Sequence, residues 1–256
     1  MNALTFLGTG TSSGVPFIGC DCDVCTSNDS KDKRLRSSVL VQSANSEILI
    51  DSGPDLRQQL LLHTPKAIDA IFYTHEHRDH TAGLDDVRPY YFKQKKNIKL
   101  FGNADVEKSL KRDYHYAFGD KVYPGAPSFD YRCIGNKDIV SVEDLQVKPL
   151  DIRHGKLNIL GYKIGAKLAY ITDASSIPDH TMDALKGLDV LIVNALRIET
   201  HHSHFNLEEA LEISNKIGAK KTYFTHISHL LGTHASVQAT LPESVTLAYD
   251  GLKINF

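Results

Sequence analysis

The sequence has little of what marks a membrane, secreted or polyanion-binding protein. It contains no run of about 18 apolar residues, and its first ten residues lack the basic region and long apolar stretch of a secretory signal. Four cysteines in 256 residues are too few for a disulfide scaffold. The 29 Lys and Arg nearly balance the 31 Asp and Glu, which leaves no whole-chain attraction to phosphate polymers or anionic lipid. We therefore expect a soluble, cytoplasmic protein with no membrane partner.

The chain is long enough for one large core, and nothing in it marks a domain boundary. It has no linker rich in Pro, Gly or Ser and no repeat of fixed period, so residues 1–256 are predicted to form a single domain. Short β-branched runs predict strands at 3–8, 38–42, 47–51, 67–74, 98–102, 146–152, 161–165, 167–172, 189–194, 221–225 and 246–249. Apolar periodicity predicts helices at 55–63, 104–116, 179–186 and 206–216. Asn206 and Glu209 form a capping box for the last helix, and Gly218 suits its end.

The order of these elements favours one fold class. Strands interspersed with helices indicate a layered α/β (α+β) architecture rather than an all-β barrel. Hairpin-like turns at 44–46 and 165–166 indicate mixed rather than purely parallel sheets.

A histidine cluster at the end of an apolar strand is the sharpest signal. The run 70–74 leads directly into His75, His77, Asp79 and His80. In an extended chain the first three share one side, because side chains alternate, and His80 follows at the turn into a helix. One metal ion takes three or four ligands at about 2.0 to 2.2 Å, which these four side chains cannot all provide with good angles. Two neighbouring metals solve the geometry, and a polar loop that is merely rich in histidine is the alternative.

Three more candidates stand at the ends of other predicted strands. His154 follows 146–152, Asp173 follows 167–172 and His226 follows 221–225. Each taken alone is better explained as an ordinary surface or core residue. Because loops at one edge of a sheet converge in space, the three together complete a ligand set with the cluster.

This pattern resembles the metallo-β-lactamase superfamily. The resemblance rests on His75-x-His77-x-Asp79-His80 and the later lone His, Asp and His, and it covers nearly the whole chain. It implies a four-layer αββα sandwich of two mixed β-sheets flanked by helices, with a dinuclear site on one edge. It also implies that Asp51 orients a ligating histidine without itself binding the metal. The implied ligands are His75, His77 and His154 for one metal, and Asp79, His80 and His226 for the other, with Asp173 bridging.

Three of the cysteines predict a second, structural metal site. Cys20, Cys22 and Cys25 supply three thiolates in a loop at about 19–26, and a fourth ligand would close a tetrahedron around zinc. His229 is the candidate, since it lies three residues beyond His226. A disulfide between Cys20 and Cys25, or free thiols, are the alternatives. Cys133 is predicted to be a bystander.

Further motifs narrow the resemblance. Gly8-Thr-Gly10, the Gly14-Val-Pro16 turn, the cysteine loop, Arg36-x-Ser38 and Thr225-His-Ile-Ser-His229 together are similar to the phosphoribosyl 1,2-cyclic phosphate phosphodiesterases. The resemblance implies that a metal-bridging hydroxide hydrolyses a small cyclic phosphate, of phosphoribosyl or cyclic nucleotide type. The segment 114–133 is longer than the family leads us to expect, which leaves the substrate open.

The resemblance also implies the cofactors and the catalytic residues. Two divalent ions, Zn or Mn, would occupy the active site, with one structural Zn in the cysteine loop. His204 is the candidate that protonates the departing ribose oxygen, and Asp79 belongs to the same catalytic set. His201 and His202 are rivals by proximity, although exposed loop positions account better for both.

Other functions stay open. A tRNA 3'-processing endonuclease of the same superfamily would need a basic surface, which this near-neutral chain lacks. A thioester or lactone hydrolase could use the same metals on a carbonyl, and a non-catalytic metal-dependent binding protein is a third alternative. A solvated loop is the better reading of the basic stretch at 93–99, and Arg88 could lean over the pocket. We expect a small phosphodiester as substrate and no nucleic acid, while a homodimer stays open.

Overall fold

Two β-sheets form the middle of the molecule. The computed structural model describes residues 2–118 and 125–256, and within these residues each sheet has seven strands. The first follows the order β14 (Lys253–Asn255), β1 (Ala3–Gly8), β2 (Ser38–Gln42), β3 (Glu47–Ile50), β4 (Ala70–Phe72), β5 (Ile98–Gly102) and β6 (Phe129–Cys133). The second follows the order β13 (Val245–Leu247), β12 (Lys221–Thr225), β11 (Val190–Asn194), β10 (Leu168–Ile171), β9 (Leu157–Ile164), β8 (Leu145–His154) and β7 (Val140–Val142).

Both sheets are mixed, with an antiparallel and a parallel part. In the first sheet β1 pairs antiparallel with β14 and β2, and β2 with β3, whereas β3 to β6 run parallel. In the second, β7 to β10 are antiparallel and β10 to β13 are parallel. The predicted hairpins at 44–46 and 165–166 are confirmed as the β2–β3 and β9–β10 connections.

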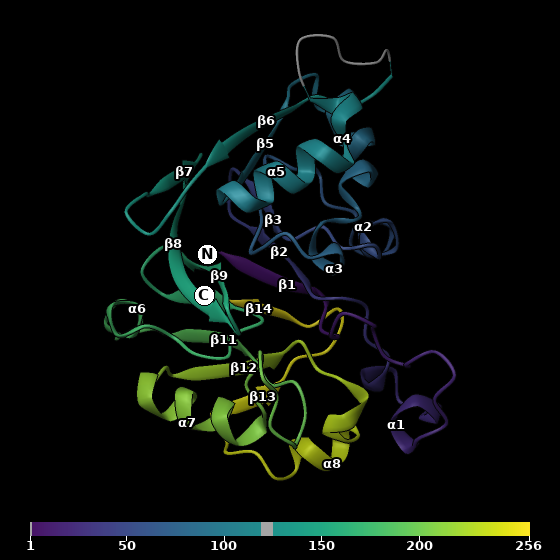
Figure 1. Cartoon of the computed structure of the whole chain (residues 1–256), viewed down its shortest axis with the longest axis vertical. Coiled ribbons are helices and arrows are strands. Elements are labelled where there is room, and N and C mark those ends of the chain that lie inside the picture. The colour runs from purple at the N-terminus through teal and green to yellow at the C-terminus, as the bar shows by residue number, and fades with distance from the viewer. Residues whose placement is uncertain (1, 119–124) are drawn as a thin grey trace.

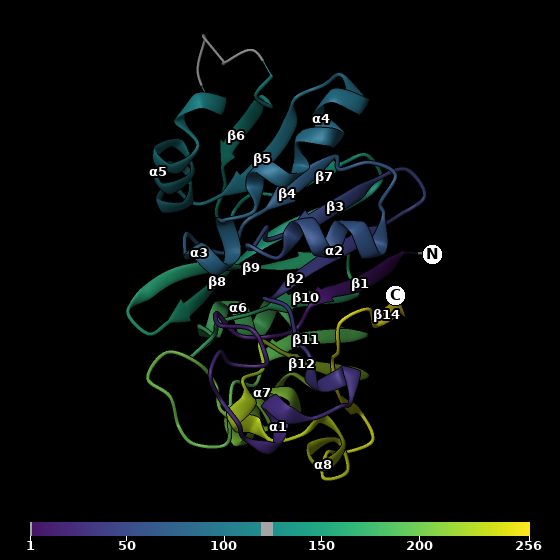
Figure 2. The ribbon, with the colours of Figure 1, turned by 90° about the vertical axis from the view of Figure 1, so that its right-hand side faces the viewer.

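Helices cover the outer face of each sheet (Figures 1 and 2). On the first sheet lie α2 (Leu56–His63), α3 (Arg78–Thr81), α4 (Arg88–Gln94) and α5 (Ala104–Asp113), with the 3-10 turns η2 (Leu84–Val87) and η3 (His115–Ala117). On the second lie α6 (Asp179–Ala184), α7 (Leu207–Ile217) and α8 (His234–Gln238). The Cys-rich N-terminal segment adds α1 (Asp23–Thr26) and η1 (Ser30–Asp32), and η4 (His229–Leu231) follows β12.

Alternating side chains explain the layers. Along β1 the fully buried Phe6 joins the core between the sheets, and its neighbour Leu7 joins the core under α2 and α5. Along β11, Ile192 and Val193 divide in the same way between the central core and the core under α7. Strands buried on both faces read as continuous apolar runs. The predicted four-layer αββα sandwich of two mixed sheets is confirmed.

Several predicted bounds were wrong in detail. The strand predicted at 67–74 is only β4, which ends at Phe72, and the helix predicted at 104–116 ends at Asp113 before the separate turn η3. The sequence did not reveal β6, β7 and β14, which are short or lie at sheet edges, or the helices α1, α4 and α8, which have four to seven residues. The helix expected at His80 is α3, which begins earlier, at Arg78. Among the described residues, no helix combines the length and the apolar character that crossing a membrane requires.

Candidate metal centres

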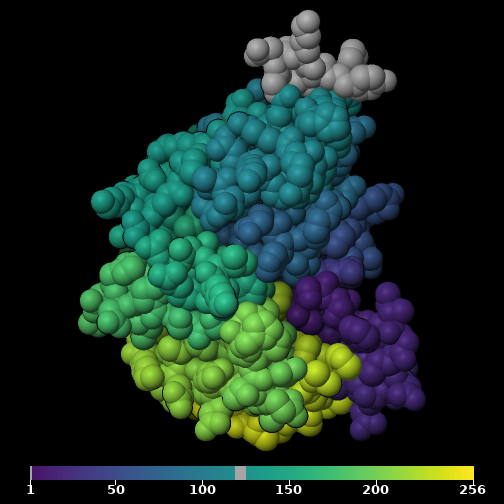
Figure 3. Space-filling view, viewed as in Figure 1, coloured from purple at the N-terminus to yellow at the C-terminus, as the bar shows by residue number. Residues whose placement is uncertain are grey.

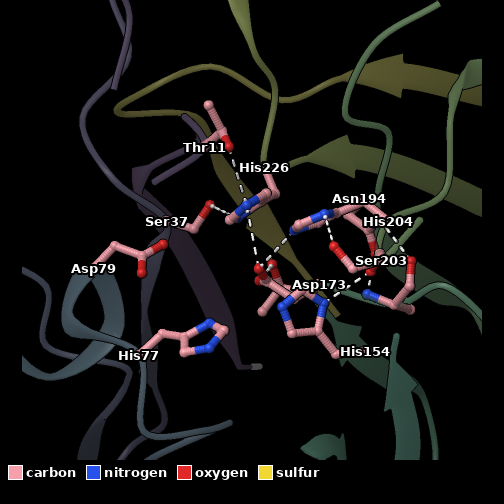
Figure 4. Close-up of polar contacts among 12 residues, drawn as sticks. Thr11, Ser37, His77, Asp79, His154, Asp173, Asn194, Ser203, His204 and His226 are labelled. Carbon is pink, nitrogen blue, oxygen red and sulfur yellow. Dashed lines mark hydrogen bonds and ion pairs between the residues drawn. The ribbon is translucent and has the colours of Figure 1, made fainter. Parts of the chain in front are cut away.

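Strand ends from both sheets deliver polar side chains to one edge of the sandwich. Asp51 follows β3, His154 ends β8, Asp173 follows β10 by two residues and His226 comes directly after β12. Figure 4 shows His154, Asp173 and His226 pointing toward one another, with His77 and Asp79 facing them from the segment that follows β4. The convergence predicted for the strand ends is confirmed, because His154 and Asp173 share one cluster and His226 contacts Asp173.

The cluster from His75 to His80 is not an extended strand. After β4 the chain turns, His77 caps the N-terminus of α3, and Asp79 and His80 lie inside this helix. Alternation of side chains is therefore the wrong reason for the grouping of His75, His77 and Asp79. A tight turn into a short helix presents the four side chains instead.

One group of ligand atoms comes from three histidines. Donor atoms of His75, His77 and His154 all lie within 4.8 Å of one another. Nε2 of His75 is 3.0 Å from Nδ1 of His77, so two ring nitrogens face the same point. Nδ1 of His154 donates to the backbone oxygen of Ser203 at 2.8 Å, which leaves Nε2 of His154 free for the cluster. These are the three residues expected to share one metal.

Asp173 stands at the centre of the second group. Its Oδ2 is 3.4 Å from Nε2 of His80, and its Oδ1 is 3.2 Å from Nε2 of His226. Oδ2 of Asp79 lies 3.2 Å from the same His80 nitrogen. The structure thus gathers Asp79, His80 and His226 around Asp173, as the resemblance implies.

Asp51 contacts the ring nitrogen of His80 that faces away from Asp79 and Asp173. Its Oδ2 accepts a hydrogen bond from Nδ1 of His80 at 2.7 Å, and its carboxylate also accepts bonds from the backbone N–H and hydroxyl of Thr74. Nε2 of His80 is buried and makes no hydrogen bond among the described residues, although the two nearby carboxylates point at it. Such an orphaned nitrogen beside two carboxylates is what a divalent metal site needs, so the donor set fits metal ions.

Burial and neighbouring charge set the protonation states of the cluster. Burial lowers the pKa of His75 well below its usual range and the pKa of His226 to about 4, so both are neutral near pH 7. Burial alone would raise the pKa values of Asp79 and Asp173, but the nearby histidines outweigh it and hold both carboxyls ionised. Neutral imidazoles and ionised carboxylates are the forms that ligate metals. His80 departs from this pattern, because the carboxylates of Asp79, Asp173 and Asp51 outweigh burial and raise its pKa well above the usual range.

Three of the strand-end residues adopt a left-handed backbone conformation that favours glycine. The φ angles are 64° for Asp51, 58° for Asp173 and 55° for His226. Such angles cost a non-glycine residue about 1 kcal/mol or more of conformational free energy. Residues that adopt them cluster at functional sites. The surrounding structure must therefore hold these three side chains at the edge.

The sequence reading missed the residues that hold this backbone. The side chain of Asn194 accepts from the backbone N–H of Ala174 at 2.7 Å and donates to the oxygen of Ala174 at 3.1 Å, which fixes the peptide after Asp173. Thr11 and Ser37 each place a hydroxyl 3.3 Å from a ring nitrogen of His226. A polar Asn at the end of a buried strand was a usable signal, whereas isolated hydroxyls were not.

His204 lies against the cluster. Its Nε2 is 3.0 Å from Oδ1 of Asp173, and its ring stacks on His226 with centroids 5.1 Å apart. His154, Asp173 and His204 also bring ligand atoms together, so geometry alone would let His204 bind a metal. His202 is exposed and packs on His201, whereas His201 contacts His204.

The structure gathers the predicted cysteine site as well. The sulfurs of Cys20 and Cys22 each lie 3.4 Å from Nδ1 of His229, and Cys25 joins them within 4.8 Å. No disulfide joins Cys20 and Cys25, so that alternative is not formed. The hydrogen bond with His229, followed by one to the backbone of Cys25, lowers the pKa of Cys22 to about 6. Burial raises the pKa of Cys25 to about 11. In Figure 3 this purple segment lies against the yellow C-terminal part of the chain.

Two expectations about the substrate side are corrected or limited. Arg88 pairs with Asp85 at 3.6 Å and lines a cavity of about 800 Å³ between α2 and α4, whose described lining holds no cluster residue. It therefore does not lean over the metal site.

Of the segment 114–133, residues 119–124 lie outside the described residues, and Tyr114 is packed with its hydroxyl donating to the oxygen of Thr81 at 2.9 Å.

Comparisons with known proteins agree with this geometry. Residues 46–227 match the Beta-lactamase superfamily domain. A solved structure described as a new diphosphatase from the PhnP family is 43% identical, with a TM-score of 0.93 over 100% of this chain and 98% of the other. Zn(2+)-bound PqqB from Methylobacterium extorquens shares the fold at 21% identity, with a TM-score of 0.78 over 99% of this chain and 100% of PqqB.

One relative is much longer than this chain. An octanoyltransferase of Porphyromonas gingivalis is 40% identical over 250 residues, which is 96% of this chain but only 50% of that protein. This chain therefore spans about half the length of that curated relative. Taken together, the matched domain, the near-complete overlap with the diphosphatase and the clustered ligands show that the chain belongs to the metallo-β-lactamase superfamily and, within it, to the PhnP family.

Proposed function

We propose that this metal-dependent hydrolase is a phosphodiesterase that opens a small cyclic phosphate, of phosphoribosyl cyclic phosphate or cyclic nucleotide type. The observation that carries the proposal is the position of Asp173. A single carboxylate contacts His80 and His226 of the ligand cluster and also His204, the candidate acid. Metal ligands and a proton donor thus share one small edge of the fold.

The proposed metal ligands follow the two groups of side chains. One ion would be held by His75, His77 and His154, the other by Asp79, His80 and His226, with Asp173 between them. Two bound divalent ions supply an activated water and neutralise charge on the phosphoryl oxygens. Zinc and manganese both suit this donor set.

The chain's own residues supply the remaining steps. Hydrolysis of a cyclic phosphodiester needs a proton for the departing ribose oxygen, and Nε2 of His204 is the group that delivers it. Asp79 keeps 14% of its side chain exposed at the cluster, so its carboxylate can accept a hydrogen bond from the attacking water. Asp51 keeps the His80 ring in one orientation throughout, because it contacts Nδ1 and not the reacting side.

The cysteine site has a structural role in this proposal. Cys20, Cys22, Cys25 and His229 fit one zinc ion. Backbone hydrogen bonds join Thr9 and Thr11 to Ile227, which lies between His226 and His229 in the sequence. A zinc ion there would tie the N-terminal loop to the segment that carries His226.

A small substrate is favoured over a nucleic acid. In the basic stretch at 93–99, Lys96 forms an ion pair with Asp69 at 2.8 Å and Lys93 donates to the oxygen of Lys66. Part of this stretch is thus engaged with the protein itself, which weakens an RNA-binding role. We therefore propose a small phosphodiester as the partner.

The proposal is tested by comparing substrate classes on one metal-loaded preparation. The kcat/KM values would be measured for ribosyl 1,2-cyclic phosphate with a 5-phosphate, a 2',3'-cyclic nucleotide, a pre-tRNA, a thioester and a lactone. The proposal expects a cyclic phosphate to exceed the others by at least about a hundredfold. Faster turnover of the pre-tRNA, or of the thioester or lactone, would contradict the proposal and identify the protein as a hydrolase of that substrate class.

A further inference from the structure

The hydroxyl of Thr11 lies at the ligand cluster and has no role in the reaction described so far. Its Oγ1 is 3.3 Å from Nε2 of His226, and the same nitrogen is 3.2 Å from Oδ1 of Asp173 (Figure 4). Thr11 belongs to the loop that follows β1, and only 8% of the residue is exposed. We propose that the Thr11 hydroxyl and the backbone N–H groups of Ser12 and Ser13 bind a phosphoryl oxygen of the substrate. This inference rests on the proposed function, because it takes the substrate to be a phosphodiester.

Backbone hydrogen bonds hold the turn from Thr11 to Gly14 in place. The N–H of Gly10 donates to the oxygen of Leu35 at 2.8 Å. The N–H of Thr11 donates to the oxygen of Ile227 at 3.0 Å, and the N–H of Gly14 closes the turn on the oxygen of Thr11 at 2.8 Å. The turn is therefore attached to both sheets by its main chain, which leaves the hydroxyl of Thr11 available to another acceptor.

His226 is a partner that Thr11 loses once the metal site is filled. The 3.3 Å between Oγ1 and Nε2 is already long for a hydrogen bond from a hydroxyl, and it is the one hydrogen bond of this hydroxyl among the described residues. Nε2 is also the nitrogen that faces Asp173, where a metal would take its lone pair. A nearly buried hydroxyl without an acceptor is unfavourable. In the metal-loaded protein, an oxygen of the substrate is the acceptor that fits this position.

The two residues after Thr11 offer further donors. The backbone N–H groups of Ser12 and Ser13 make no hydrogen bond within residues 2–118 and 125–256. Nε of Arg36 donates to the oxygen of Ser12 at 3.1 Å. Because the C=O and N–H of a trans peptide point in opposite directions, this bond directs the N–H of Ser13 away from Arg36. Successive N–H groups of a turn form a concavity that binds anions.

Neutral donors suit the charge at this edge. The ionised carboxylates of Asp79 and Asp173 repel a phosphate anion and can only accept hydrogen bonds. A phosphodiester has two unesterified oxygens that share a negative charge, and hydrogen bonds to charged oxygens are stronger than those between neutral groups. Donors fixed in a rigid turn also stabilise the charge that builds up on these oxygens in the transition state.

Valine and serine at position 11 separate phosphoryl binding from folding. Valine has nearly the shape of threonine but no hydroxyl, whereas serine keeps the hydroxyl. Thr246→Val is the matched control, because Thr246 is a half-buried threonine of β13 (Val245–Leu247), the edge strand of the second sheet. We expect all three variants to bind the active-site metals as tightly as the parent protein does in a competition titration with a chelating dye.

The first readout needs no turnover. Isothermal titration of the metal-loaded proteins with inorganic phosphate gives the dissociation constant of a probe that carries the same oxygens. We expect Thr11→Val to raise this constant about tenfold or more, and Thr11→Ser and Thr246→Val to change it less than about threefold. An unchanged constant in Thr11→Val would overturn the inference. A matching loss of metal affinity would also overturn it, because the hydroxyl would then act only by supporting His226.

The second readout is kinetic. With a cyclic phosphodiester, kcat/KM should fall about tenfold or more in Thr11→Val and recover most of its value in Thr11→Ser. Turnover of a cyclic phosphate that is equal in Thr11→Val and the parent protein would refute the role of Thr11 and leave the proposed function standing. Weaker phosphate binding by Thr11→Val in a protein that opens no cyclic phosphate would refute the proposed substrate and leave the phosphoryl site standing.

Discussion

The Oδ2 atom of Asp51 lies 2.7 Å from Nδ1 of His80, and both side chains are fully buried. Asp51 comes from the end of β3 with a left-handed backbone, and His80 from the short helix α3. This contact turns the second ring nitrogen of His80 toward Asp79 and Asp173, where it has no hydrogen-bond partner among the described residues. The buried pair therefore fixes one corner of the ligand cluster.

Removing the charge of Asp51 should weaken metal binding. In Asp51→Asn we expect about 10- to 100-fold lower affinity for the more weakly held active-site ion, because partners behind a ligand orient it and raise its basicity. Competition titration with a chelating dye measures the affinity. Asp189→Asn is the matched control, since Asp189 pairs with Lys220 at the start of β11, at the opposite end from Asn194. Equal affinities for the two variants would contradict the role of Asp51.

Removing the imidazole of His204 should slow turnover without releasing metal. For a substrate with an alkoxide leaving group we expect His204→Ala to reduce kcat about 10²- to 10⁴-fold, because the departing oxygen loses its proton donor. With a p-nitrophenyl leaving group, which departs without a proton, the loss should be much smaller. Metal analysis of the same samples should show unchanged content. Loss of one ion would instead make His204 a ligand, as its contact with Asp173 also allows.

The cysteine site should bind metal independently of the active site. Cys22→Ser should lower the zinc content by one ion per chain and lower the thermal unfolding midpoint, because binding to a folded site contributes to folding stability. Cys133→Ser should change neither, since Cys133 is exposed at the end of β6. Elemental analysis and calorimetry of the purified variants provide the measurements. Full zinc content in Cys22→Ser would be the contrary result.

A buried histidine near the C-terminus should make stability depend on pH. Burial, reinforced by Arg34, lowers the pKa of His234 to about 4, and Nδ1 of His234 lies 3.3 Å from the guanidinium of Arg34. The unfolded chain takes up a proton near pH 6.5, whereas the folded protein resists it until about pH 4. Stability should therefore fall as the pH drops through that window.

Replacing His234 should remove this part of the dependence. When the pH drops from 7 to 4.5, the free energy of unfolding should fall by about 1 to 3 kcal/mol less in His234→Gln than in the parent protein. Urea denaturation at both pH values gives the difference, and histidines elsewhere contribute equally to both proteins. An identical loss in His234→Gln would show that His234 titrates normally.

The sequence predicted the members of the site better than the backbone that presents them. The motif from His75 to His80 and the strand-end residues could be recognised because residue type and position at a strand end are local features. Alternation failed for His77 and Asp79, because the chain leaves β4 at Phe72 and enters α3. The capping box of Asn206 and Glu209 was predicted correctly, since both of its hydrogen bonds are made within four residues.

Contacts of single hydroxyl and amide side chains between distant segments could not be predicted. Ser37 reaches His226 across 189 residues, and Asn194 secures the peptide after Asp173 from the neighbouring strand. The left-handed conformations of Asp51, Asp173 and His226 could not be recognised from residue type, because none of these residues is glycine. Only the assembled sheets impose them.

We propose that water attacks the phosphorus of a cyclic phosphate at this cluster, with His204 as the proton donor to the departing oxygen. The most direct test is phosphorus NMR of the metal-loaded protein with ribosyl 1,2-cyclic phosphate bearing a 5-phosphate, in water enriched in ¹⁸O. We predict loss of the cyclic resonance and a single phosphomonoester product whose signal carries one ¹⁸O shift, with slower conversion by His204→Ala. An unopened ring in protein shown to hold both active-site metals, or a product without ¹⁸O on phosphorus, would contradict the account.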